Sequence, residues 1–248
     1  MAIDCILAMT AAEIRANSPF QQKIAWLSCH FSSCSTGISN LPEGLPPGSL
    51  LILDDSIPYD GHDNGRIAAE LEEVLIMQNC EGLLLDFQRE WNEGIMTLAK
   101  ALSQGLPCPV AVSECYAADA NGPVFLPPVP PDIPLRDYLK PWEGREIWLD
   151  ISPGGTELRL TTGGCTAAPL PVHEIPAGIL HADTALLCHY TIHTEADCVA
   201  FRLLRTGEDL ENLAVQAKAL GVTKCVGLWQ ELAMPDSEGH DLIHGQRS

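Results

Sequence analysis

Lysine and arginine are scarce in this 248-residue sequence: 14 of them face 33 aspartates and glutamates, which gives a formal net charge of −19. A chain this acidic has no basic surface for a nucleic-acid backbone, and anionic membranes repel it. The sequence also lacks any run of about 18 apolar residues, the length that a membrane-spanning helix needs. We therefore expect neither nucleic acid nor a membrane as a partner.

Several motifs of cofactor and catalytic sites are missing as well. No strand-like segment is followed by G-x-G-x-x-G, and neither a P-loop, a G-x-S-x-G elbow nor an H-E-x-x-H pair occurs. Ten cysteines are present without a C-x-x-C pair, which disfavours a zinc ribbon. The apolar start 1–9 has no basic residue, unlike a secretory signal. These absences predict a cytoplasmic protein with free thiols and without a metal or cofactor.

Short apolar segments alternate with helix-period patterns along a chain that is 46% hydrophobic. Fully apolar strands alternating with helices are typical of a parallel sheet covered on both faces. The number of segments predicts an α/β fold, a closed (β/α)8 TIM-like barrel, with an open doubly wound sheet as the alternative. The expected strands are 3–8, 23–29, 49–54, 82–87, 109–113, 146–151, 185–192 and 224–229. Helices are expected at 10–22 and at 206–220. Between them, one helix is expected to begin at Arg66, and another is marked by apolar residues from Ile95 to Leu102 and closed by Gly105.

Two regions depart from this alternation. Six prolines lie between residues 123 and 134, which argues against a helix and against a central strand, although a short strand at Val124–Leu126 remains open. Segments 157–160 and 166–170 flank a Thr-Gly-Gly turn and predict a β-hairpin insertion near 157–170. Segment 199–204 fits a strand or a helix. We expect one barrel domain over 1–232 and a polar C-terminal tail over 233–248.

Acidic side chains recur where the expected strands end. Asp54 ends one strand, Asp86 and Gln88 lie at the end of the next, and Glu114 follows the one after. In a parallel barrel the carboxyl ends of the strands carry the functional residues. An acid-lined mouth suits a carbohydrate or another small polar ligand. Tyr190 and Trp229 also lie near expected strand ends, so we expect them in the same pocket.

The segment from Glu81 to Gln88 reads E-G-L-L-L-D-F-Q. It resembles the fourth strand of family 18 glycoside hydrolases, the chitinase-like barrels, whose pattern is D-G-x-D-x-D-[WF]-E. Gly82, Asp86 and Phe87 match this pattern. The closing V-G-L-W, which ends at Trp229, is similar to the last strand of that family, where the tryptophan floors the sugar site. The resemblance covers about 60 residues and implies a carbohydrate-active TIM barrel.

Two departures from the pattern put catalysis in question. Leu84 replaces the middle Asp, and Gln88 replaces the terminal Glu that serves as the proton donor in the resembled family. An amide cannot act as a general acid, and the loss of one typically costs about 10²–10⁴-fold in rate. Either Glu114 or Glu90 replaces the acid, with Asp86 as the nucleophile, or the barrel is a non-catalytic carbohydrate-binding or scaffold protein. Gln88, Asp54, Tyr190 and Trp229 are the expected substrate-binding residues.

Overall fold

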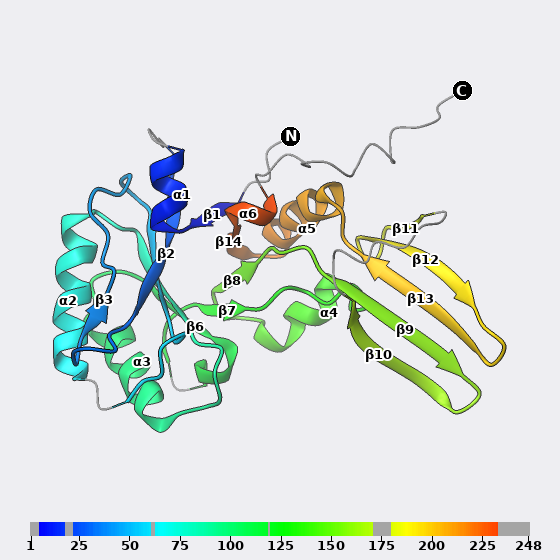
Figure 1. Cartoon of the computed structure of the whole chain (residues 1–248), viewed down its shortest axis with the longest axis horizontal. Coiled ribbons are helices and arrows are strands. Elements are labelled where there is room, and N and C mark those ends of the chain that lie inside the picture. Colours follow the sequence, from blue (N-terminus) through cyan, green and yellow to red (C-terminus); the bar gives the residue numbers. More distant parts are fainter. Residues whose placement is uncertain (1–4, 18–21, 61–62, 119, 171–179, 233–248) are drawn as a thin grey trace.

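Eight parallel strands close into a barrel in the computed structural model, which describes residues 5–17, 22–60, 63–118, 120–170 and 180–232 (Figure 1). The barrel closes because β1 pairs with both β14 and β2. Its strands are β1 (Ile6–Met9), β2 (Ile24–Phe31), β4 (Leu50–Asp54), β5 (Gly82–Asp86), β6 (Val110–Ser113), β7 (Val124–Leu126), β8 (Ile147–Asp150) and β14 (Val222–Leu228). The predicted (β/α)8 fold is confirmed, and the open sheet is excluded.

Helices and short turns surround the barrel. The α-helices are α1 (Ala11–Ala16), α2 (Asn64–Met77), α3 (Glu93–Gly105), α4 (Leu135–Leu139), α5 (Gly207–Ala219) and α6 (Trp229–Leu232). Two 3₁₀ turns, η1 (Glu114–Tyr116) and η2 (Lys140–Trp142), and the two-residue strand β3 (Ile38–Ser39) complete this part. Local sequence sets the helix starts: the Asp63 carboxylate accepts the backbone N–H groups of Gly65 and Arg66, and Thr206 and Asp209 form a capping box.

The interior of the barrel is filled by a separate small cluster of side chains. It contains Ala8, Ala25, Leu50, Ile52, Leu84, Ala111, Phe125, Trp148 and Val226. Trp148 is fully buried, and a Cβ on Gly82 would lie 2.8 Å from its ring, so only glycine fits on that part of β5. The rest of the apolar core lies between the strands and the helices. The barrel is therefore a packed core, and ligands have access only at its ends.

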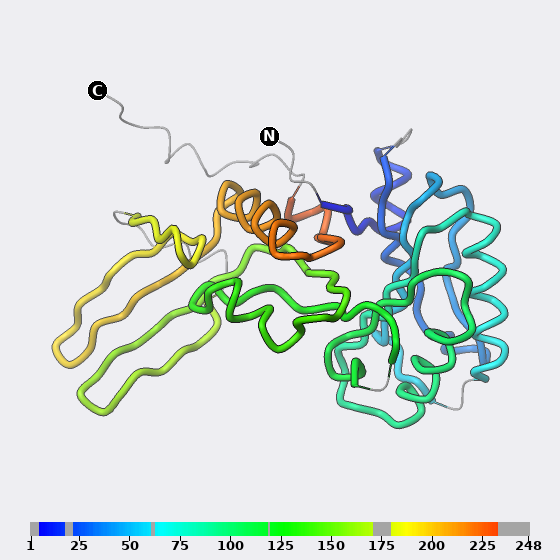
Figure 2. The backbone as a smooth tube through the Cα atoms, turned by 180° about the vertical axis from the view of Figure 1, so that it is seen from behind, coloured from blue at the N-terminus to red at the C-terminus, as the bar shows by residue number. Residues whose placement is uncertain are grey.

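A five-stranded antiparallel sheet is inserted between β8 and α5 and projects from the barrel (Figures 1 and 2). Its strands are β9 (Gly155–Thr161), β10 (Gly164–Leu170), β11 (His181–Asp183), β12 (Cys188–Thr194) and β13 (Cys198–Leu204), in the order β10-β9-β13-β12-β11. The predicted hairpin is confirmed as β9 and β10. The expected strand at 185–192 and the segment 199–204 lie in this sheet as β12 and β13, outside the barrel.

The Pro-rich region corrects one prediction. β7 is a central barrel strand between β6 and β8, and α4 lies in the same region. Three residues suffice for β7 because the prolines flank it at positions 123 and 127 and do not interrupt it. Pro134 is the N-cap of α4, where no backbone donor is needed.

Three smaller differences concern element bounds. The first helix ends at Ala16, and residues 18–21 lie outside the described ranges. Trp229 begins α6 and does not end a strand. The expected tail 233–248 also lies outside the described residues.

Candidate functional site

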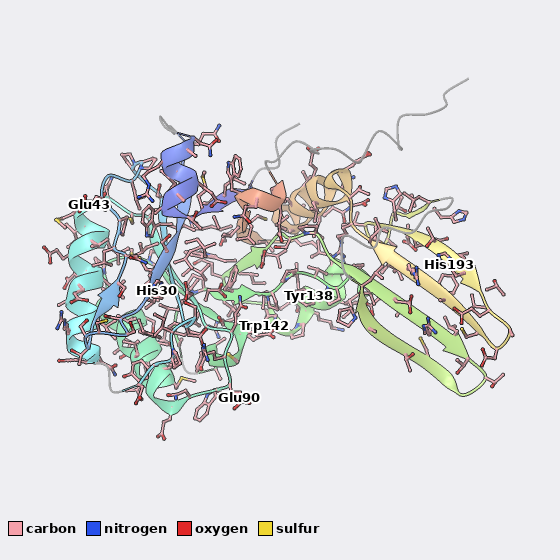
Figure 3. All side chains as sticks on the ribbon, in the orientation of Figure 1. His30, Glu43, Glu90, Tyr138, Trp142 and His193 are labelled. Carbon is pink, nitrogen blue, oxygen red and sulfur yellow. The ribbon has the colours of Figure 1, made fainter. Side chains whose placement is uncertain are left out.

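Three aspartates end barrel strands with their side chains toward the barrel interior. Ile52, Leu84 and Trp148 belong to the cluster inside the barrel. Each aspartate follows one of them by two residues on the same strand: Asp54, Asp86 and Asp150. Because side chains two apart share one face of a strand, the aspartates face the same space. Asp54 and Asp86 lie opposite each other in register. His30, at the end of β2, lies opposite Asp54 in turn (Figure 3).

Gln88 contacts Asp86 directly. The side-chain amide nitrogen of Gln88 lies 3.2 Å from each carboxylate oxygen of Asp86 and donates to both. Burial raises the pKa of Asp86, the Gln88 amide lowers it, and the charges of Asp54 and Asp55 raise it further. The net pKa of Asp86 is raised, so its ionised form has lost more hydration than the amide restores.

Asp55 fixes the backbone that carries Gln88. Its carboxylate is 3% exposed and accepts the backbone N–H groups of Gln88 and Arg89, each at 3.0 Å. The Arg89 guanidinium donates in return to the backbone oxygens of Asp55 and Ser56 at 2.6 and 2.7 Å. Asp55 is thus a positioning residue for the loop after β5. Asp55 directly follows the strand-end acid Asp54 in the sequence, and no motif there indicates this loop contact.

Asp150 is a candidate functional residue that was not among the site residues predicted from the sequence. Ser152 donates its hydroxyl to Asp150 at 2.7 Å. Burial raises the pKa of Asp150 to about 7, with smaller contributions from the charges of Asp86 and Glu231. Burial likewise raises the pKa of Glu231. An acid that exchanges its proton near neutral pH is suited to proton transfer. The signal was present in the sequence, because an apolar strand ends at this acid.

The raised pKa of Asp150 predicts a pH-dependent stability. Its pKa is about 7 in the folded chain against an ordinary 3.8, so the folded state holds the proton more tightly. The stability that Asp150 contributes is complete below about pH 4 and is lost as the pH rises to 7. Relative to Asp150→Asn, wild type should lose on the order of 2 kcal/mol across this window. Urea unfolding of both proteins at several pH values measures the difference, and parallel curves would contradict it.

Glu114 occupies a different environment from Asp86. Glu114 is exposed and is the first residue of η1, directly after β6. Burial raises the pKa of Cys115 and that of Tyr138, and the charge of Glu114 raises both further. The Tyr138 hydroxyl donates to the backbone oxygen of Pro127, just beyond β7, and Asp150 also acts on its pKa (Figure 3). The charges that act on the pKa of Asp86 come from Asp54 and Asp55, and Glu114 is not among the causes. Tyr138 carries no motif that could have revealed it.

Of the two expected aromatic residues, Tyr190 lies outside the barrel, whereas Trp229 directly follows the barrel strand β14. Tyr190 is on β12 in the inserted sheet, where its ring centroid lies 5.3 Å from that of His181 and 6.2 Å from that of Phe201. Trp229 is half-buried and packs against the main hydrophobic core. The barrel-strand ends therefore bring together Asp54, Asp86, Gln88 and Asp150, whereas Tyr190 belongs to the projecting sheet.

Other polar groups have structural partners. His189 lies with its Nδ1 2.8 Å from Asp209, the capping residue of α5, as a structural histidine should. Among the residues that the structure describes, one group of side chains has ligand atoms close enough for a shared metal ion: Glu195, Asp197 and Cys198, all within 4.8 Å of one another. This group lies at the turn between β12 and β13, far along the chain from the strand-end aspartates. No helix in the described ranges is both long and apolar enough to cross a membrane.

No protein-family model matches the sequence, and no curated protein matches it. Solved structures with the same fold are found among carbohydrate-active barrels. A chitinase from Chromobacterium violaceum has a TM-score of 0.54 and 11% identity, over 94% of this chain and 96% of that one. The spore cortex-lytic enzyme SleL of Bacillus cereus has a TM-score of 0.54 and 10% identity, over 94% and 72%.

A third similar structure is the GH18 chitinase from Cycas revoluta in complex with (GlcNAc)3. Its TM-score is 0.53 at 11% identity, over 90% of this chain and 93% of that one. At identities this low, the structural similarity establishes a shared fold only. The resemblance to chitinase-like barrels that residues 81–88 predicted is thus confirmed at the level of the fold, over 90–94% of this chain.

Proposed function

We propose that the carboxyl ends of the barrel strands form a carbohydrate-binding site centred on Asp86 and Gln88. The observation that carries this proposal is the contact between the Gln88 amide and both oxygens of Asp86. A carboxylate beside an amide offers acceptors and donors together, which matches the hydroxyl and acetamido groups of a sugar. Asp54 and Asp150 add acceptors to the same space.

The ligand class follows from charge and from the fold. A site lined by aspartates in a chain of net charge −19 disfavours anionic ligands and leaves neutral or cationic ones. One structure of the same fold is a chitinase in complex with (GlcNAc)3. A neutral oligomer of N-acetylglucosamine is therefore the first ligand to test.

Gln88 favours binding over hydrolysis by the route of the resembled family. The terminal Glu of that motif donates a proton, whereas the amide at this position donates a hydrogen bond without transferring the proton. The amide donates to both oxygens of Asp86 and so offsets part of the rise in its pKa that burial causes. This arrangement supports a sugar-binding barrel in which Asp86 and Gln88 hydrogen-bond the ligand without cleaving it.

Asp86→Ala should reduce affinity for (GlcNAc)3 by at least about tenfold. The substitution removes a partly desolvated carboxylate that would accept hydrogen bonds from the sugar, and a hydrogen bond to a charged group typically contributes about 1.5–3 kcal/mol. Isothermal titration calorimetry measures the effect, with Glu72→Ala, an exposed acid on α2, as the matched control. Equal binding by Asp86→Ala and wild type would refute Asp86 as the centre. Absence of binding by wild type would refute the ligand class.

Hydrolysis is the second candidate, and Asp150 is the specific observation in its favour. A carboxyl group with a pKa of about 7 can donate a proton near neutrality, as the missing Glu would. Asp86 would then act as the nucleophile or as a charge that stabilises the developing cation, and Glu114 is the other possible acid. An activity that depends on Asp150 and not on Glu114 would assign the proton donor. Aryl glycosides of N-acetylglucosamine serve as the substrates.

A further inference from the structure

The loop that connects β5 to α3 is held at its start by buried polar groups on both sides. Asp55, which directly follows β4, accepts the backbone N–H groups of Gln88 and Arg89 at 3.0 Å each. The buried hydroxyl group of Ser113, which ends β6, accepts the N–H of Phe87 at 2.9 Å. Residues from the two strands that flank β5 therefore fix the first part of this loop.

The end of the loop is fixed as well. The backbone N–H of Asn92 donates to the hydroxyl oxygen of Tyr116, a fully buried residue of η1, at 3.2 Å. The side-chain oxygen of Asn92 accepts the N–H groups of Gly94 and Ile95 and so caps α3. A loop that is fixed at both ends loses little conformational entropy when it binds a ligand, which favours affinity.

Between these fixed points the loop exposes the side chain of Trp91. Trp91 is 59% exposed, whereas Trp26 and Trp148 are buried and Trp142 and Trp229 are half-buried. Trp91 is thus the one strongly exposed tryptophan of the five in the chain. Contact between water and this apolar surface is unfavourable, and a ligand that covers the indole removes it.

A single exposed apolar residue is common on a protein surface, so its place in the fold decides what it means. The other exposed large apolar side chains among the described residues lie on helices, at a helix cap or in the inserted sheet: Ile76, Met77, Val215, Leu220, Leu160 and Ile192. Of this set only Trp91 lies in a loop at the carboxyl ends of the barrel strands, the end of the barrel that carries Asp86 and Gln88.

Trp91 lies close enough to Gln88 for one oligosaccharide to reach both. It is three residues further along the chain, so the Cα atoms of the two residues lie within about 11 Å of each other. With one ring at Asp86 and Gln88, an oligosaccharide reaches such an indole with a following ring. The C–H groups on one face of a sugar ring suit the face of an indole, where the π-electrons carry partial negative charge.

We propose that Trp91 contacts a second sugar ring and makes the site selective for an oligosaccharide over a single sugar. This inference rests on the proposed sugar site at Asp86 and Gln88 and adds a ligand length to it. A stacked indole carries no charge, so the acidity of the chain does not oppose the contact. Tryptophan is also among the residues that most often dominate a binding energy.

Calorimetry with GlcNAc and with (GlcNAc)3 tests the proposal on the full chain. Trp91→Ala should weaken binding of (GlcNAc)3 by at least about fivefold and leave binding of GlcNAc within about twofold of wild type. Trp91→Tyr keeps an aromatic face and should retain most of the affinity. Ile76→Ala is the matched control, because Ile76 is 63% exposed at the end of α2, and it should bind both sugars like wild type.

Acrylamide quenching of tryptophan fluorescence provides a second readout. (GlcNAc)3 should protect wild type from quenching, because the ligand covers the exposed indole, and should not protect Trp91→Phe. Equal affinity of Trp91→Ala and wild type for (GlcNAc)3 would overturn this inference and leave the site at Asp86 intact. An equal loss for GlcNAc and (GlcNAc)3 would overturn the contact with a second ring. Absence of binding of either sugar by wild type would instead overturn the proposed function itself.

Discussion

Arg205→Met is expected to destabilise the fold by about 3 kcal/mol, a loss in the range typical of a broken buried polar network. Arg205 is 4% exposed and follows β13 directly. Its guanidinium donates to the backbone oxygens of Leu187, Leu186 and Pro130 at 3.2, 3.2 and 3.3 Å, and also to that of Val129. The Arg205 side chain thus joins the Pro-rich segment and the turn before β12 by hydrogen bonds, directly before the start of α5.

The expected loss has two physical sources. Without the guanidinium, buried carbonyl groups lose their donors, and each unsatisfied group costs about 1–3 kcal/mol unless water reaches it. Leu187 also has a φ of 53°, in the left-handed region that is unfavourable for leucine, and the bond from Arg205 to its oxygen helps to hold that turn. Burial lowers the pKa of Arg205, and the charges of Asp209 and Asp132 offset only part of this effect.

Thermal unfolding provides the measurement. A loss of about 3 kcal/mol should lower Tm by about 6–12 °C for a chain of this size. Arg202→Met is the control, because Arg202 lies three residues earlier and is paired with Glu157 at 2.7 Å on a more exposed face. Its loss should cost about 0.5 kcal/mol. Equal Tm values for the two variants would show that Arg205 does not hold these segments together.

Gln88→Glu is expected to increase cleavage of an aryl N-acetylglucosaminide by about 10²–10⁴-fold over wild type. The new carboxyl group would lie where the amide now contacts both oxygens of Asp86. Two carboxyl groups at this distance cannot both ionise readily, so one of them keeps a proton at neutral pH. The pair would then contain the general acid that the wild-type sequence lacks.

Leu84 decides whether one substitution is enough. It replaces the middle Asp of the resembled motif and is 1% exposed inside the barrel. The double variant Leu84→Asp/Gln88→Glu therefore tests whether both positions are needed, with unfolding curves to check that the buried acid is tolerated. Inactivity of both variants, if folded, would contradict a lost hydrolytic site. A wild-type activity that Glu114→Gln abolishes and Gln88→Glu leaves unchanged would favour the pairing of Asp86 with Glu114.

Local sequence was sufficient where neighbouring residues determine the structure. Thr10 with Glu13 and Thr206 with Asp209 have the sequence spacing of capping boxes, and the structure contains both. The Thr-Gly-Gly turn predicted the hairpin β9–β10, because such a turn needs only adjacent residues. The fully apolar strands β4 and β5 were equally clear, since both their faces are buried in a parallel sheet.

Segments whose place depends on distant neighbours were harder to predict. β7 was recognised only as a possible strand, because its three residues take part in a sheet through pairing with β6 and β8. The segment of β12 was expected as a barrel strand, and the segment of β13 fitted either a strand or a helix. Their half-buried polar positions, such as His193 and Arg202, are typical of an antiparallel sheet with water on one face. Alternation along the strand was the available signal.

The sequence by itself determined the barrel class, the acids at the strand ends and the replacement of the motif's last Glu by Gln88. These properties depend on residue type and on short-range spacing. Only the tertiary structure decided which strand ends meet: it brought Asp150 near Asp86, left Glu114 beside Tyr138, and moved Tyr190 into the projecting sheet. The physical reason is that proximity and burial, which set hydrogen bonds and pKa values, arise when the sheet closes and do not depend on separation along the chain.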